Sequence, residues 1–395
     1  MSPVVDRILP ALERLRPLVD GHVTTERVRR YLRAIAELPA PSTAASALRT
    51  PLLRRLLAED GALDEADLHL HHDLAGTCST AILTGSSEPA KPLWYLAHLD
   101  TLSYLVQPRQ GGRYPLVPFG YHLIGSGRRP ARAYRFDLAL ERYCVTADGE
   151  LVSEEGRPFF LPDDPGVEIE AGDRLVLHAP YREDEATGTF TGHVDNAGAV
   201  AALAVAAPVL ARAGIEALLA FPDEEEGPQS AGSQSMGRGG SRIVGLLPAP
   251  ELAIVADVQQ AGGGPDAHTE GGIENTTRLG DGAVLAEFSS LARGAVTPPH
   301  LYALARATIG PLARLGVRVQ ASNNAYTSRS DDVSVLLKTP NILLLGFPGF
   351  NRHFDRGEPR ANLNDVVDLA KAAVYYAALR PLLRELQQRL AEAAA

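Results

Sequence analysis

Apolar residues in the N-terminal part of the chain recur at intervals of three and four. Val28, Tyr31, Leu32 and Ile35 show this spacing. It places their side chains on one face of a helix, where they can pack together against a neighbour. We therefore expect the segment before residue 70 to form helices that each pack through one apolar face.

Farther along the chain, short runs of consecutive apolar residues replace the helical spacing. A run of roughly four to eight apolar residues is typical of a strand that is buried on both faces of a sheet. Residues 197–212 and 366–379 read instead as helices, and Asn196 and Asp365 or Asn364 stand where each helix needs a cap. Strands that alternate with helices predict an α/β fold, a three-layer sandwich with a largely parallel central sheet. The four apolar runs are 92–97, 217–221, 252–256 and 341–345.

The segment 103–188 has a different texture. It is rich in glycine, proline, arginine and aromatic residues, and turn-forming pairs such as 111–112 and 148–149 divide it into short pieces. Short pieces between turns are typical of β structure. We therefore expect residues 103–188 to form a small β domain inserted into a main domain, which consists of residues 1–102 and 189–395.

Composition and charge exclude several classes of partner. The chain has 38 basic and 48 acidic residues, with a formal net charge of -10, which disfavours binding to nucleic acid or to an anionic membrane. Its two cysteines, Cys78 and Cys144, are too few for a disulfide framework and lack the spacing of a thiolate metal site. Charged residues interrupt any signal-peptide core, and no apolar run reaches the roughly 18 residues of a membrane helix. We expect a cytoplasmic protein.

Ionisable residues follow every one of the four predicted strands. The carboxyl ends of the strands in an open α/β sheet lie beside the crevice where ligands bind, so side chains from distant segments can converge there. Two imidazoles with several carboxylates form the ligand set expected for zinc, or for cobalt or manganese. The strands are followed by His98 and Asp100, by residues 223–226, by Asp257 and by His353, while Asp195 stands just before the helix at 197–212.

Each of these residues also has an ordinary structural interpretation. A single histidine after a strand is most often a satisfied polar residue, but Asp100 offers His98 the partner that a metal-bound imidazole needs for its second ring nitrogen. A glutamate run such as 224–226 is most often a solvated face, yet this run follows a buried strand and ends at Gly227. Asp257 follows five apolar residues and needs a cation or hydrogen-bond donors nearby.

Taken together, the motifs resemble those of the co-catalytic zinc aminopeptidases, and most of all the glutamyl aminopeptidase and deblocking aminopeptidase family. The resemblance rests on the order and approximate spacing of 98–100, 192–198, 224–227, Asp257 and His353. It extends over roughly residues 25 to 380. A domain inserted between the first and the second ligand is a feature of the same family, and residues 171–176 look like the family's strand leading back to the main domain.

The resemblance implies a dinuclear metallopeptidase that hydrolyses a peptide or a small amide and assembles into a homo-oligomer. Two divalent ions, zinc or in its place cobalt or manganese, would be bound by five residues, with Asp195 as the bridge. Glu224 would be the general base, and Asp100 would orient His98. The implied ligands are Glu225 and His353 at one metal and His98 and Asp257 at the other, with Asp195 shared.

Two other functions remain open at this point. The first is a carboxypeptidase or an N-acyl amino-acid amidohydrolase on the same scaffold, which would need a cation for the substrate carboxylate. Arg329 and Arg352 are candidates for that cation. The second is a metal-poor relative that serves in binding or assembly and has no enzymatic activity.

Overall fold

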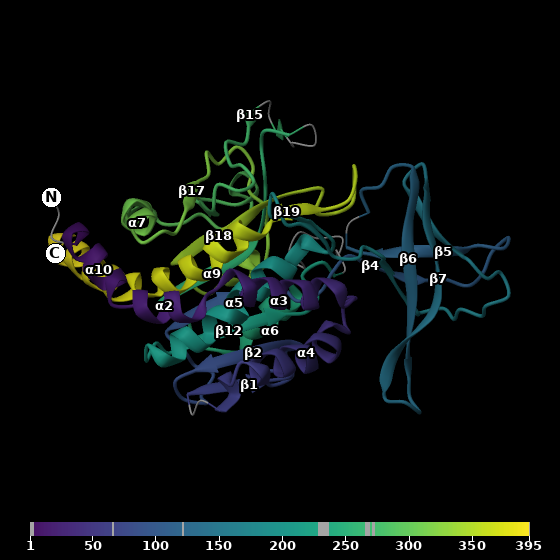
Figure 1. Cartoon of the computed structure of the whole chain (residues 1–395), viewed down its shortest axis with the longest axis horizontal. Helices are drawn as coiled ribbons and strands as arrows, with labels where there is room; N and C mark the ends of the chain where they lie inside the picture. The colour runs from purple at the N-terminus through teal and green to yellow at the C-terminus, as the bar shows by residue number, and fades with distance from the viewer. Residues whose placement is uncertain are drawn as a thin grey trace.

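The structure is a computed structural model of the chain, and it describes residues 4–64, 67–120, 122–227, 237–264, 269–270 and 273–394. An α/β body and a smaller β-barrel lie side by side, with both chain termini at the end of the body that is farthest from the barrel (Figure 1). The predicted fold class, an α/β sandwich with an inserted small β domain, is confirmed.

The core of the body is a mixed 11-stranded sheet. Its central strands β12, β3, β13 and β18 are parallel to one another, and the outer strands add antiparallel edges that the apolar runs did not predict. The strands are β1 (Leu68–His71), β2 (Ser79–Thr84), β12 (Ala217–Pro222), β3 (Leu93–Leu96), β13 (Leu252–Gln260), β18 (Ile342–Phe350), β19 (Arg360–Asn362), β11 (Thr189–Thr191), β10 (Arg182–Asp184), β16 (Ala283–Ala286) and β17 (Val319–Ala321).

Helices cover both faces of this sheet. One face packs against α3, α5 and α9 in the largest apolar cluster, and the other packs against α6 and α8 in a second cluster. The helices are α1 (Ile8–Glu13), α2 (Arg16–His22), α3 (Thr25–Glu37), α4 (Ala45–Glu59), α5 (Val194–Arg212), α6 (Arg238–Leu246), α7 (Pro299–Arg314), α8 (Asp332–Val335), α9 (Leu363–Ala377) and α10 (Leu379–Ala394).

Helix α5 is the central helix of the body. It is rich in alanine, and the apolar window that makes it long and hydrophobic enough to cross a membrane is 100% buried inside the protein. Alanine side chains allow close approach of the neighbouring α3 and α9, with which α5 is in contact. This helix is therefore accounted for as a core element of the body.

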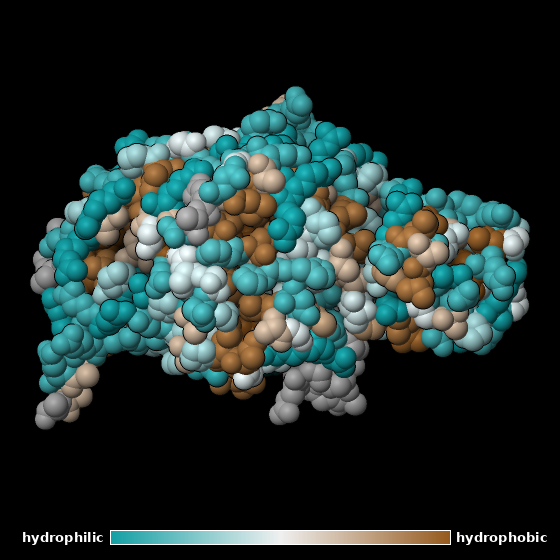
Figure 2. All heavy atoms as spheres, turned by 90° about the horizontal axis from the view of Figure 1, so that it is seen from below, coloured by the Kyte–Doolittle hydropathy of each residue, from teal (hydrophilic) through white to brown (hydrophobic). Residues whose placement is uncertain are grey.

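The second unit is a closed barrel with the strand order β4-β5-β8-β7-β6-β9. It has an apolar core of its own, and apolar side chains also gather on its surface in the view of Figure 2. A small hairpin, β14 (Thr269–Glu270) with β15 (Ile273–Glu274), belongs to neither sheet. The barrel strands are β4 (Ser103–Val106), β5 (Tyr114–Phe119), β6 (Gly127–Asp137), β7 (Arg142–Glu154), β8 (Arg157–Pro162) and β9 (Arg174–Leu177).

Candidate metal centre

The carboxyl ends of the central parallel strands bring the candidate residues together. His98 is the second residue after the end of β3, and hydrogen bonding to the β12 segment continues past it, since the N–H of Leu99 donates to the carbonyl oxygen of Pro222 at 2.7 Å. Asp257 lies within β13, opposite Gly346 of β18. Residues far apart in the sequence therefore meet at one edge of the sheet, as the pattern predicted.

His98, Asp195 and Asp257 form one group, here called the first half-site. Nε2 of His98 lies 2.9 Å from Oδ1 of Asp195 and 3.8 Å from Oδ2 of Asp257. All three residues are buried, and their ligand atoms lie within 4.8 Å of one another. One imidazole and two carboxylates at this spacing can share a divalent ion.

Asp195 also belongs to a second group with Glu226 and His353, here called the second half-site. Nε2 of His353 lies 3.5 Å from Oδ2 of Asp195 and 3.8 Å from Oε2 of Glu226. The two oxygens of Asp195 thus face different histidines, Oδ1 facing His98 and Oδ2 facing His353. This is the arrangement expected of a bridging carboxylate.

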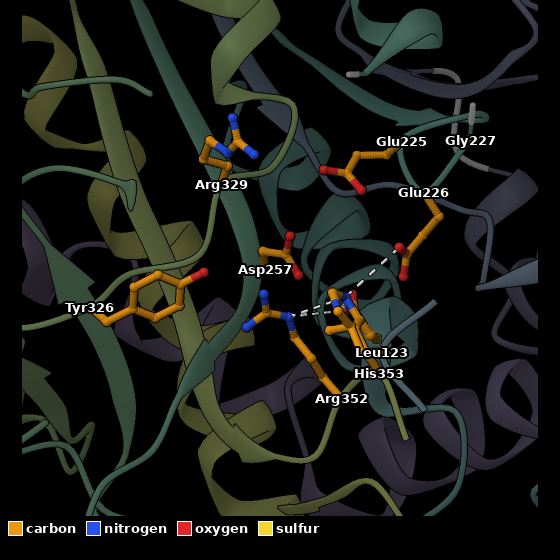
Figure 3. Close-up of a pocket in the computed structure, with 10 residues that line it drawn as sticks. Leu123, Glu225, Glu226, Gly227, Asp257, Tyr326, Arg329, Arg352 and His353 are labelled. Atoms are coloured by element: carbon orange, nitrogen blue, oxygen red, sulfur yellow. Dashed lines mark hydrogen bonds and ion pairs between the residues drawn. The ribbon is translucent and has the colours of Figure 1, made fainter. Parts of the chain in front are cut away.

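The three consecutive glutamates point in different directions. Glu224 has a φ of 65°, and its carboxylate turns away to accept a hydrogen bond from Nη1 of Arg242 at 2.6 Å. Glu225 lines the cavity, with Oε2 4.0 Å from Nε2 of His98, and Glu226 belongs to the second half-site. In Figure 3, Glu225 and Glu226 both point into the cavity.

This arrangement differs by one residue from the expected one, in which Glu224 is the base and Glu225 a ligand. The left-handed turn lies at Glu224, which faces α6, and the next two glutamates reach the cavity. Gly227 is needed for space, because an added Cβ would lie 2.9 Å from Cε1 of Phe119.

Asp100 connects the two half-sites through hydrogen bonds. Its carboxylate lies 3.5 Å from Nδ1 of His98, although the backbone carbonyl of Asp100 is closer to that nitrogen, at 3.0 Å. The same carboxylate accepts the backbone N–H groups of Glu225 and Glu226 at 3.0 and 3.2 Å and the hydroxyl of Ser42 at 2.6 Å. The residue expected to orient one histidine therefore also fixes the turn that carries two glutamates.

The barrel touches the second half-site, which the sequence did not indicate. Gly120 approaches so closely that an added Cβ would lie 1.8 Å from the backbone oxygen of Glu226. Phe354, the residue after His353, belongs to the apolar core of the barrel. Its ring also meets His193 edge to face, with centroids 5.6 Å apart.

The carboxylates of the cluster are buried close together, and the pKa of several of them is raised. Burial, helped by the charge of Asp195, raises the pKa of Asp257 to about 8, and burial raises the pKa of Glu225 and of Glu226 well above the usual range. Burial opposes ionisation of Asp195 as well, but hydrogen bonds with the two half-site histidines outweigh it and lower its pKa. Oε1 of Glu226 is buried without a hydrogen-bond partner among the described residues. This donor set fits divalent metal ions, which would neutralise the crowded carboxylates.

A cavity of about 180 Å³ opens beside the half-sites and is lined by both acidic and basic side chains. In Figure 3, Arg329 lies above Asp257 and Arg352 below it, with Tyr326 to the left. Nε of Arg352 lies 3.5 Å from Oδ2 of Asp195. A substrate entering here would therefore meet carboxylates and guanidinium groups close together.

Comparisons with known proteins agree with this architecture. The structure resembles an aminopeptidase from the archaeon Desulfurococcus kamchatkensis, with a TM-score of 0.68 and 15% identity over 91% of this chain and 98% of the other. It also resembles a TET aminopeptidase from a marine sediment archaeon of the Thaumarchaeota, with a TM-score of 0.65 and 15% identity over 88% and 96%. For the Pyrococcus horikoshii TET1 peptidase the TM-score is 0.64 at 16% identity over 90% and 99%. At these identities the likeness establishes the fold.

A search of curated proteins by sequence found no match. The model of peptidase family M20/M25/M40 matches residues 167–379, which is more than half of the chain and includes Asp195, the glutamate run, Asp257 and His353. The chain therefore belongs to peptidase family M20/M25/M40.

Proposed function

We propose that the protein is a dinuclear metal-dependent aminopeptidase. The observation that carries this proposal is the placement of Asp195, whose two carboxylate oxygens face the histidines of two buried half-sites. Zinc fits the mixed imidazole and carboxylate donors, and cobalt or manganese can replace it. When bound, the ions would polarise the scissile carbonyl and lower the pKa of water, which is what peptide hydrolysis needs at neutral pH.

We assign the general base to Glu225. Its carboxylate reaches the cavity, lies 4.0 Å from the first half-site histidine, and is fixed at its backbone by Asp100. It would accept a proton from the attacking water and deliver that proton to the leaving amine. Glu226 would be a metal ligand in the second half-site. This mechanism requires neither a serine nor a cysteine nucleophile.

The aminopeptidase reading, including its glutamyl or deblocking form, is supported by the fold shared with two proteins described as aminopeptidases. A specific observation favours a second candidate, a carboxypeptidase or N-acyl amino-acid amidohydrolase. Arg329 and Arg352 both line the cavity and can attract a substrate carboxylate. Paired substrates with a free and with an acylated amino group separate the two, because only an aminopeptidase needs the free amine.

The first experiment is elemental analysis of the purified protein after reconstitution with zinc or cobalt, combined with a screen of chromogenic amino-acid and acyl amides. We expect close to two ions per chain and turnover that is lost on chelation and restored by metal. A metal content that stays near zero would overturn the enzyme proposal and favour a binding or assembly protein.

We further propose that residues 103–188 are a separate inserted domain through which the chain forms a homo-oligomer. The TET1 peptidase of Pyrococcus horikoshii can assemble into a tetrahedron or a large octahedral shell. Exposed apolar side chains on the barrel strands or their connections support association through this domain; they include Val117, Phe136, Leu138, Leu140 and Val145. Light scattering should find an assembly larger than a monomer.

The two free cysteines are consistent with the cytoplasm as the compartment.

A further inference from the structure

The guanidinium of Arg352 lies at the ligand atoms of the second half-site. Its Nε donates a hydrogen bond to Nε2 of His353 at 3.3 Å and lies 3.5 Å from Oδ2 of Asp195. These are the two atoms with which His353 and Asp195 would bind a metal ion. In Figure 3 the side chain of Arg352 reaches alongside His353.

A positive charge at this place acts against a second one. The guanidinium group stays protonated in proteins, so the cation is permanent. A divalent ion at the second half-site would be repelled by it, and it would also need the lone pair of His353 that the arginine now engages. The two cations therefore compete for the same ligands.

The first half-site has a different environment. His98 and Asp257 face each other and the shared Asp195. The charge of Arg352 also acts on Asp257, where it opposes the rise of the pKa, but the hydrogen bond of its Nε goes to His353. The asymmetry is therefore one of contact, because Arg352 engages the histidine of the second half-site and the Asp195 oxygen that faces this histidine.

We propose that Arg352 competes with the second metal ion for the ligands of the second half-site. This half-site therefore binds a divalent cation more weakly than the first. The inference rests on the proposed dinuclear function and adds an order of loading to it. The arginine has space into which it can move, because two adjoining cavities are both lined by Arg352 and Tyr326. Loading of the second ion requires that displacement, whereas loading of the first does not.

The test is a titration of the metal-free full-length chain with Co²⁺, followed by calorimetry and by the visible absorption of the bound ion. We expect two binding steps in the unsubstituted protein, with the second at least roughly tenfold weaker, the size of effect that a nearby partly screened charge produces. Arg352→Met, which keeps most of the side-chain volume, should tighten the second step by roughly tenfold to a hundredfold and leave the first unchanged. Arg352→Lys keeps the charge and should leave the second step weak.

Two controls define the steps. His353→Ala should remove the weaker step, which identifies it as the second half-site. Arg329→Met removes a different cation from the same cavity, and both steps should stay close to those of the unsubstituted protein. If Arg352→Met is poorly folded by circular dichroism, Arg352→Gln replaces it with the same expectation.

The possible results separate this inference from the proposed function. Equal affinity of the two steps in the unsubstituted protein, or a second step that Arg352→Met and Arg352→Gln leave unchanged, would overturn the role of Arg352 while the dinuclear enzyme stands. Absence of metal binding in every variant would overturn the dinuclear function and this inference with it.

Discussion

The two half-sites share Asp195 but are built on different kinds of scaffold. His98 and Asp257 belong to the ends of neighbouring parallel strands, whose ladder pairs Ala253 with Trp94 and Val255 with Leu96. Glu226 and His353 lie on irregular segments after β12 and β18. A strand ladder fixes backbone positions through many hydrogen bonds, whereas a loop takes its position from whatever packs against it.

The element that packs against the second half-site is the barrel. Gly120 meets the backbone of Glu226, and Phe354 enters the barrel core directly after His353. Phe354 has a φ of 60°, a conformation that a bulky residue keeps only when its surroundings impose it. The comparison teaches that one candidate metal position is built mainly on strands of the body, while the other lies on segments positioned by contact between the two units.

The largest effect should come from the glutamate that we assign as the base. Glu225→Gln keeps the size of the side chain but removes the proton acceptor, so turnover should fall by roughly two to four orders of magnitude while both ions stay bound. Glu226→Gln weakens a ligand and should lower occupancy of the second half-site together with activity. Amidase rates and metal content measured on both variants check this.

Two other outcomes would contradict these roles of the glutamates. If Glu225→Gln loses metal and Glu226→Gln keeps it, the roles of the two residues are exchanged. If neither variant changes the rate, the glutamate turn is not part of the catalytic centre.

Phe354→Ala should weaken the second half-site more than the first. The side chain is 5% exposed, and truncation of a buried phenylalanine costs about 3–5 kcal/mol of unfolding free energy. Because Phe354 anchors the loop of His353 on the barrel, we expect the second ion to be lost at a lower chelator concentration than in the unsubstituted protein, while release of the first ion stays unchanged. The measurements are denaturant unfolding and metal content at each chelator concentration.

A matched control is Leu151→Ala, which opens a cavity within the same barrel core. It should destabilise the barrel while both ions stay bound. Loss of both ions at the same chelator concentration in Phe354→Ala would show that the half-sites are not separately supported.

Asp100→Asn should affect both half-sites, and by less. The amide keeps one acceptor oxygen but has no negative charge. In the unsubstituted protein the carboxylate accepts hydrogen bonds from the backbone N–H groups of Glu225 and Glu226, and it lies near His98. Loss of such an outer partner typically lowers metal affinity by about tenfold to a hundredfold. Calorimetry should find both binding steps weakened, and an effect confined to one step would contradict the connecting role of Asp100.

Local pattern was sufficient to predict the body and the strand-end residues. The run at 252–256 became part of β13, which continues through Asp257 to Gln260, and His98 lies just beyond the end of β3. Both follow from short-range rules, because a buried strand is apolar and its carboxyl end faces the ligand crevice. The outer antiparallel strands β10, β11 and β19 left no such signal, since each has only three residues, too few for a pattern of apolar positions.

The contacts that support the second half-site could not be read in the same way. The register of the glutamates depends on the left-handed conformation of Glu224, which no rule assigns to a glutamate when Gly227 stands three residues away. The contacts of Gly120 with Glu226 and of Phe354 with the barrel join segments more than a hundred residues apart. The competing position of Arg352 depends on the same tertiary arrangement.

The smallest effect should come from Glu224→Gln, which tests whether Glu224 lies outside the catalytic centre, as our assignment of Glu225 as the base requires. Glu224 pairs with Arg242 and Arg238 of α6; the side chains of the arginines are each 39% exposed, whereas that of Glu224 is 5% exposed. Replacing this carboxylate with an amide should cost about 1–3 kcal/mol of unfolding free energy, with solvent at the arginines keeping the cost toward the lower end. Because the carboxylate faces α6 and not the cavity, turnover and metal content should stay within roughly threefold of the unsubstituted protein, far from the effect of removing a proton acceptor. A loss of two orders of magnitude in rate with both ions retained would instead identify Glu224 as the base, the role that the family resemblance implied.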